Sequence, residues 1–161
     1  MLVGHNWQHS NKPIAHIVPK SVTNTTAAGD WIVEPWKLAN QLTFLFMGGA
    51  WAATVDGSAV IQGRKRSDGS AVTLKEKDGV TNLALTATYL DDAGAGENGL
   101  IPGTIPLEDI DSETYDAVRM LYTEAGNAAA LICVVAILSG FKERPSGTTD
   151  DLFSKAHQLA D

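Results

Sequence analysis

The sequence predicts an all-β protein, an antiparallel β-sandwich with an extended N-terminal arm and a short C-terminal helix. Three observations predict this fold. Short apolar or alternating runs recur along the chain, turn signals rich in Gly, Pro and Asn separate them, and the clearest helical spacing lies at the C-terminus. At 161 residues the chain is long enough to bury a core within one domain. A jelly roll is one arrangement that such a sandwich can take.

Three regions are expected along the chain. They are an arm of residues 1–12, a sandwich domain of residues 13–145 and a tail of residues 146–161. The arm shows no period, and its Trp7 needs another surface to lie against if it is ordered. The tail predicts a short helix over residues 150–160 with an apolar stripe that includes Leu152 and Phe153. Because a lone helix of this length is marginal in water, it must dock on its own domain or on a neighbour.

The most apolar stretch of the chain is residues 114–138, two runs separated by Glu124-Ala125-Gly126-Asn127. The first run alternates, the second is almost unbroken Ala, Leu, Ile, Cys and Val, and the Gly-Asn signal between them predicts an antiparallel hairpin. A strand that is apolar on both faces is buried on both sides or covered by a neighbouring subunit. A helix over residues 128–138 is the alternative, but its β-branched residues favour a strand.

In the first half of the chain, strands are expected wherever apolar residues alternate. The expected elements are a strand over residues 14–18 ended by Pro19, a loop over residues 21–30, an extended segment over residues 31–33 ended by Pro35, and a strand from residue 41 to Gly48-Gly49. The last of these is the best candidate for a central strand, because Leu42, Phe44 and Phe46 share one face. Gly48-Gly49 then predicts a turn or a β-bulge.

A second hairpin is expected in the middle of the chain. Residues 59–62 and 71–75 flank Asp68-Gly69, and a tight turn needs residues that tolerate positive φ. Residues 81–90 alternate weakly and predict either a strand or one or two helical turns. Residues 91–103 form the least structured stretch, a loop by composition.

The charge distribution argues against some partners and suggests others. The formal net charge of −7 opposes a nucleic-acid binder, which would need a basic face. Positive charge gathers at Arg64, Lys65 and Arg66, and an acidic segment follows it, which suits head-to-tail contact between copies or contact with a charged partner. Solvated loops of opposite sign are the alternative. No run is long enough to span a membrane and no secretory signal is present, so we expect a protein that is kept soluble in the cytoplasm or released from it by a route other than secretion.

No arrangement of residues forms a catalytic or metal-binding motif. The chain has no Gly-x-Ser-x-Gly elbow, phosphate-binding loop or Cys-His pair with an orienting acid, and its single cysteine, Cys133, lies in an apolar run. The scattered histidines match no closed zinc pattern. The acidic loop residues lack the ligand spacing of a calcium site. We therefore expect no enzymatic activity, no cofactor and no metal. The histidines and loop acids concerned are His5, His9, His16, Asp91, Asp92 and Glu97.

The order of several segments resembles small virion structural proteins of tailed bacteriophages, of the capsid decoration, cement or head-completion type. These segments are VPKSVTN at residues 18–24, a Trp-led strand, LTFLFMGG, GRKRSDGS, YDAVR at residues 115–119 and VVAILSGFKERP, and together they cover roughly residues 14–145. The resemblance implies a β-sandwich, often jelly-roll-like, that decorates or cements a capsid without catalysis. The acidic insert around residues 91–111 and the C-terminal helix are not part of that pattern.

The sequence-based hypothesis is therefore a non-enzymatic virion protein assembled in the host cytoplasm. Its expected partners are the major capsid protein and further copies of itself, with no nucleic acid and no membrane. The expected interface residues are Trp7, Arg64, Lys65, Arg66, Leu152 and Phe153. The alternatives are a head-tail junction or tail component, a small hydrolase that uses the acidic loops, and a carbohydrate-binding module. In the last, Trp31, Trp36 or Trp51 would stack on sugar rings.

Overall fold

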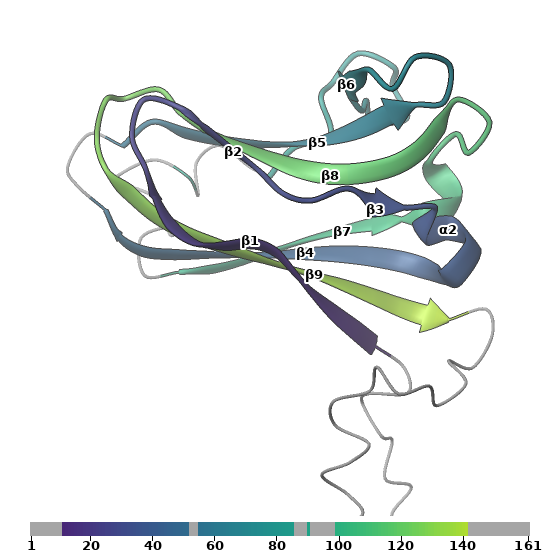
Figure 1. Ribbon diagram of the computed structural model, residues 1–161, viewed down its shortest axis with the longest axis horizontal. Coiled ribbons are helices and arrows are strands. Elements are labelled where there is room, and N and C mark those ends of the chain that lie inside the picture. The colour runs from purple at the N-terminus through teal and green to yellow at the C-terminus, as the bar shows by residue number, and fades with distance from the viewer. Residues whose placement is uncertain (1–10, 52–54, 86–89, 91–98, 142–161) are drawn as a thin grey trace, which may run out of the picture.

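Two antiparallel sheets pack face to face around one apolar core (Figure 1). The computed structural model describes residues 11–51, 55–85, 90 and 99–141. Sheet 1 has the order β1 (Asn11–Val22), β9 (Ala130–Phe141), β4 (Ala39–Trp51) and β7 (Leu100–Pro106). Sheet 2 has β2 (Thr26–Ala28) and β3 (Ile32–Val33) beside β8 (Tyr115–Glu124), followed by β5 (Gly57–Lys65) and β6 (Ala71–Thr73). A short helix, α2 (Pro35–Leu38), and a 3-10 turn, η2 (Leu107–Asp109), complete the described elements.

The strand pairing is nested along the chain. β1 pairs with β9, β2 and β3 pair with β8, β4 pairs with β7, and β5 pairs with β6. Two more pairings, β9 with β4 and β8 with β5, join these ribbons into the two sheets. A long hairpin rolled up in this way is a jelly roll, the double Greek-key form of the sandwich. The predicted all-β sandwich is confirmed, and it takes the jelly-roll form. The predicted C-terminal helix over residues 150–160 lies outside the described residues.

The hairpin predicted over residues 114–138 is wrong, although both of its strands exist. β8 lies in sheet 2 and β9 in sheet 1, so the segment between them carries the chain across the core instead of folding it back within one sheet. Asn127 supplies the positive φ, 58°, that the Gly-Asn signal indicated. A turn signal predicts a change of direction but not the sheet that the next strand joins. The helical alternative for residues 128–138 is also excluded, because β9 covers most of them.

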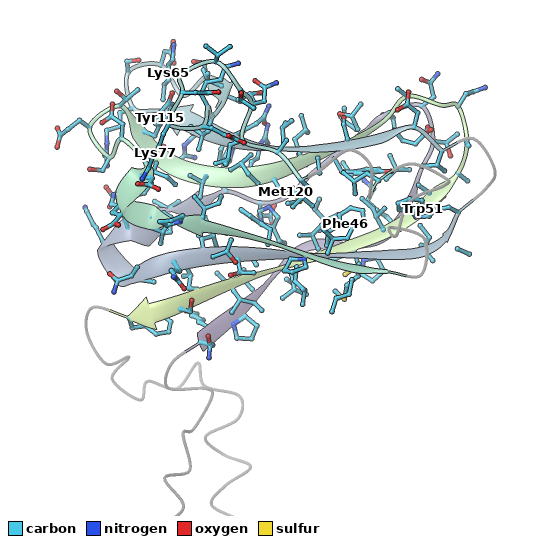
Figure 2. The ribbon with its side chains drawn as sticks, turned by 180° about the vertical axis from the view of Figure 1, so that it is seen from behind. Phe46, Trp51, Lys65, Lys77, Tyr115 and Met120 are labelled. Atoms are coloured by element: carbon cyan, nitrogen blue, oxygen red, sulfur yellow. The ribbon has the colours of Figure 1, made fainter. Side chains whose placement is uncertain are left out.

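Alternation along the strands of sheet 1 builds one side of the core. The inward residues of β9 are buried, namely Ala130, Ile132, Val134, Ala136 and Leu138. Leu42, Phe44 and Phe46 of β4 are fully buried beside them, which confirms the predicted inner face. From sheet 2, Met120 and Tyr122 are also fully buried. Figure 2 shows Phe46 and Met120 between the two sheets.

The first strand is longer than predicted. β1 starts at Asn11, inside the stretch assigned to the arm, and continues through Pro19 to Val22. The prediction that Pro19 ends it is wrong, because β1 is an edge strand and one side of it has no ladder to donate to. The register shifts between Ile17 and Lys20 accommodate the proline. Pro35, by contrast, is the first residue of α2, where a missing N–H costs little.

The turn predictions of the middle region are confirmed. Gly69 has φ 72° at the tip of the β5–β6 hairpin, and Asp68 accepts the Ser70 N–H at 2.9 Å. The register of β4 shifts after Gly48, the expected bulge. Residues 81–85 form only isolated bridges, to Lys75 and Val60, and the rest of the ambiguous stretch to residue 90 is mostly outside the described residues. No helix in the described part of the chain is long and apolar enough to cross a membrane.

Candidate interaction surfaces

The outward rows of sheet 1 form a surface that we call the uncharged face. The register places Leu45 between Val135 and Pro102, and Met47 between Cys133 and Leu100. Thr43 lies between Ile137 and Thr104 in the next row. Edge strand β1 and the far end of β9 complete it. The face comprises Pro13, Ala15, Thr43, Leu45, Met47, Leu100, Pro102, Thr104, Leu131, Cys133, Val135 and Ile137.

The composition of this face is unusual for the open side of a sandwich. Antiparallel sheets commonly present polar residues on the side away from the core. Here the outward residues are mostly aliphatic, none is charged, and Leu100 and Leu131 are 60% and 44% exposed. The second run of residues 114–138 was expected to be buried on both sides or covered by a neighbouring subunit. Burial on both sides within one chain is wrong for β9, because its outward side is open, and cover by a neighbour stays a prediction. An exposed apolar surface of this kind marks an interaction site.

The outer face of sheet 2 is polar by comparison. Arg64 donates two hydrogen bonds to Asp116, Nε to Oδ1 at 2.7 Å and Nη2 to Oδ2 at 3.0 Å. The Arg119 guanidinium lies 4.2 Å from the centroid of the Trp31 ring, and its Nε donates to Gln62 Oε1 at 3.0 Å. The two outer faces of the sandwich thus differ in kind, and only that of sheet 1 is apolar.

The predicted basic interface residues are largely occupied within the chain. Arg64 is held by Asp116, and Arg66 donates to Glu34 Oε1 at 2.8 Å and to the Ser112 carbonyl at 2.9 Å. The hydrogen bond between Arg64 and Asp116 raises the pKa of the guanidinium and lowers the pKa of the carboxyl. Lys65 has no ion pair among the described residues. The other three predicted interface residues, Trp7, Leu152 and Phe153, lie outside the described residues.

The acidic segment is also partnered inside the chain. Asp109 pairs with Lys77 at 3.1 Å, and Asp111 accepts from the Thr114 hydroxyl at 2.6 Å. The hydrogen bond from the Thr114 hydroxyl, together with those from the Glu113 and Thr114 N–H groups, lowers the pKa of Asp111. Among the described residues, no three His, Cys, Asp or Glu side chains group closely enough to hold a metal ion. The predicted loop acids Asp91, Asp92 and Glu97 lie outside the described residues.

A groove of about 670 Å³ opens between β6 and β7, where the sandwich is not closed. Apolar residues such as Leu74, Leu83 and Ile105 line it, and the Lys77–Asp109 pair lies at its side. Figure 2 shows Lys77 and Tyr115 at this end of the molecule, opposite Trp51. The carboxylates of Asp109 and Asp111 beside the groove are already ion-paired or hydrogen-bonded within the chain, so the groove offers mainly its apolar lining to a ligand.

The tryptophans proposed as sugar platforms are mostly inside the protein. Trp36 and Trp51 are each 8% exposed, and the Trp51 indole donates to the Leu131 carbonyl at 3.2 Å. Trp31 is more open, but the Arg119 guanidinium covers one side of its ring. A flat aromatic platform open to sugar rings is therefore not present at these three positions.

A buried histidine joins the two sheets, which sequence reasoning missed. His16 is the extra residue of a β-bulge in β1, so both it and Ile17 point inward. Its Nε2 accepts the backbone N–H of Met120, in sheet 2, at 2.9 Å. Gly29 leaves room for the ring, since a Cβ there would lie 2.0 Å from Nε2. The sequence offered only the adjacent residues His16 and Ile17, and the glycine Gly29, as signals. Gly29 is too far from His16 in the chain for the two to be connected without knowledge of the fold.

A buried carboxylate at the last residue of β8 holds three loops together. Glu124 is 1% exposed and accepts the backbone N–H groups of Asn24, Asp56 and Ala128. Burial alone would raise its pKa, but these N–H groups favour the charged form and the pKa stays below its usual value. The sequence placed Glu124 in a turn and did not indicate this role.

Comparisons with solved structures find likenesses at low sequence identity. No family model and no curated protein matches the chain. A solved structure of the infectious bursal disease virus VP2 subviral particle matches with a TM-score of 0.48 and 13% identity, over 84% of this chain and 34% of that one. The structure of the infectious bursal disease virus Gx strain matches with a TM-score of 0.46 and 16% identity, over 83% and 33%. The chain thus spans about a third of those proteins, and such values do not assign it to a family.

Proposed function

We propose that this chain is a non-enzymatic structural protein of a virus particle that decorates or cements the capsid. The uncharged face of sheet 1 is the observation that carries the proposal. A protein that acts alone in solution has no use for a broad aliphatic surface on the outside of its sandwich, whereas an assembly protein needs one. The role follows from this surface and not from any arrangement of reactive groups.

The fold is compatible with this assignment. Jelly rolls recur in viral capsid, lectin and cupin domains, so the topology alone does not decide between these settings. The order of sequence segments resembles small virion proteins of tailed bacteriophages, which favours the first. The buried positions of Trp36 and Trp51 disfavour the second, because a lectin of the predicted kind needs exposed aromatic rings.

The ends of the described chain suggest how it holds a capsid. Asn11 of β1 pairs with Ser139 of β9, so residues 1–10 and 142–161 attach at the same end of sheet 1 (Figure 1). Two segments that start side by side can grip one partner together, and linked contacts gain affinity by multivalency. In this proposal Trp7, Leu152 and Phe153 contact the major capsid protein, and Lys65 adds a charge that no described residue pairs.

Mass spectrometry of particles purified from the strain that encodes this chain tests the proposal. The expected result is that the chain copurifies with the major shell protein. A copy number of hundreds would indicate decoration of the lattice, and about a dozen would indicate the portal vertex and the head-tail alternative. Absence of the chain from purified particles would overturn the proposal.

Truncations separate the contribution of the arm from that of the tail. Deleting residues 1–10 or residues 148–161 should weaken incorporation into particles while the isolated domain stays folded, because neither segment belongs to a described strand. Far-UV circular dichroism provides the control for folding. Wild-type incorporation of both truncated proteins would remove the arm and tail from the proposal.

A further inference from the structure

We propose that the uncharged face of sheet 1 is where two copies of this chain meet, stacked sheet against sheet around a two-fold axis. The inference rests on the proposed function for its setting and names the partner of that face. In such a dimer each copy presents the same surface to the other. The two copies of sheet 1 lie in the middle, and the polar faces of both copies of sheet 2 stay in solvent.

Charge makes this face the most suitable one for a contact between two copies. With a formal net charge of −7 each, two copies repel one another, and a contact at an uncharged face adds no close pair of like charges. The outward rows of sheet 1 hold only apolar and neutral polar side chains. The exposed residues Lys12 and Lys20 of β1 lie outside these rows, opposite the buried residues Leu138 and Ile132. Stacking two such faces therefore removes no charged group from water.

The size of the face matches the requirement of a specific dimer. Four strands about 4.8 Å apart, with outward rows roughly 25–35 Å long, give on the order of 600 Å² per copy. Two copies would then bury on the order of 1,200 Å² together, the lower end of the range for specific interfaces. The expected dimer is therefore one that dissociates on dilution and that a particle lattice would hold together.

The edge strands of the sandwich are unsuited to the main alternative mode of self-association, in which a strand of another copy pairs with an edge strand. β1 and β7 are the edges of sheet 1, and β1 contains Pro13 and Pro19 while β7 contains Pro102 and Pro106. A proline has no N–H to offer an added strand, so these edges resist pairing with another copy. In sheet 2 the edge strands are short, with three residues in β2, two in β3 and three in β6. Contact between faces remains as the available route.

The single cysteine of the chain reports directly on this face. Cys133 lies in the row with Met47 and Leu100 and is partly exposed in one copy. Stacked sheets pack about 10 Å apart, which leaves no room for a thiol reagent between them. Cys133 should therefore react quickly with a maleimide at low protein concentration and slowly at high concentration, in step with dimer formation.

Sedimentation equilibrium of the full-length chain measures the dimer itself. The expected wild-type mass rises with concentration from 17.1 kDa towards twice that value. Leu45→Lys and Val135→Lys each place an amine within the face, which should raise the dissociation constant at least about 100-fold. Leu121→Lys is the matched control, because Leu121 is a partly exposed outward residue of β8 in sheet 2. Its dissociation constant should equal that of the wild type.

Every outcome decides the inference. A wild-type chain that stays monomeric at high micromolar concentration overturns it, and so does a dimer that Leu45→Lys and Val135→Lys leave intact. A monomer whose Cys133 becomes more reactive when residues 142–161 are deleted would show that the chain's own tail covers the face. A monomeric chain found in particles would contradict only the dimer. A dimeric chain absent from particles would contradict only the virion role.

Discussion

The contact between His16 and Met120 makes the stability of the sandwich depend on pH. Burial lowers the pKa of His16 from 6.5 to about 4; Asp30 opposes this effect and Arg119 adds to it. The Met120 N–H can donate to Nε2 only when that nitrogen carries no proton, so the bond belongs to the neutral ring. His16 is 4% exposed, and solvent therefore screens little of the effect. Protonation must either break the bond between the sheets or unfold the chain around it.

The sign and size of the effect follow from the two pKa values. Between pH 6.5 and about 4 the unfolded chain carries a proton on His16 that the folded chain does not, so stability falls as the pH falls. The stabilisation is complete above pH 6.5 and is lost once the pH is below about 4. The full difference is about 3 kcal/mol, of which about 2 kcal/mol is lost between pH 7 and pH 4.5.

Urea unfolding of the wild type and of His16→Gln at both pH values tests this reasoning. The variant cannot titrate at this position, so its free energy of unfolding should change about 2 kcal/mol less between pH 7 and pH 4.5 than that of the wild type. An NMR titration of the wild-type imidazole is a second readout that does not require a folded variant. Equal pH dependence of the two proteins, or an imidazole that titrates near 6.5, would refute the account.

Three further changes test other contacts of the fold. Glu124→Ala should lower the free energy of unfolding at neutral pH by about 3 kcal/mol, because it leaves buried N–H groups unpaired, and Glu124→Gln should cost less; urea unfolding measures both, and a neutral alanine variant would contradict the role of this carboxylate. Gly29→Ala should cost about 1–3 kcal/mol, since a Cβ would collide with the His16 ring, and thermal unfolding measures the loss. A protein that carries both Gly29→Ala and His16→Ala should be free of that collision. If the two losses in free energy of unfolding simply add in this double variant, the collision is not the cause of the first loss. Arg119→Ala should uncover the Trp31 ring, lowering stability by about 1 kcal/mol and shifting tryptophan fluorescence to longer wavelength; unchanged emission would show that the ring was already in water.

Much of the fold could be predicted from local pattern. The buried rows of β4 and β9 follow from alternation, and the β5–β6 hairpin follows from Asp68-Gly69, because in each case the cause lies within a few residues. The pairing of β8 and β9 could not be predicted in the same way. Their separation into two sheets depends on the nested pairing of the whole jelly roll. Likewise, Glu124 accepts hydrogen bonds from Asn24 and Asp56, which lie 100 and 68 residues earlier in the chain.

The candidate surfaces were predicted in part. The apolar outer side of β9 was visible in the sequence, but the face as a whole depends on β4, β7 and β1 lying beside β9. Arg64 and Arg66 looked free because their partners, Asp116 and Glu34, lie 52 and 32 residues away. Of the three basic residues, only Lys65 has no ion-pair partner among the described residues. Long-range partners of this kind are invisible to a reading based on composition and local spacing.

The accessibility of Cys133 in intact particles tests the central claim most directly. Particles purified from the encoding strain would be treated with a maleimide before and after dissociation, and labelling of Cys133 would be measured by mass spectrometry. If the uncharged face is an assembly surface, Cys133 is protected in the particle and labelled after dissociation. Equal labelling in both states would contradict the account, because the face would then be open to solvent where it is proposed to be covered.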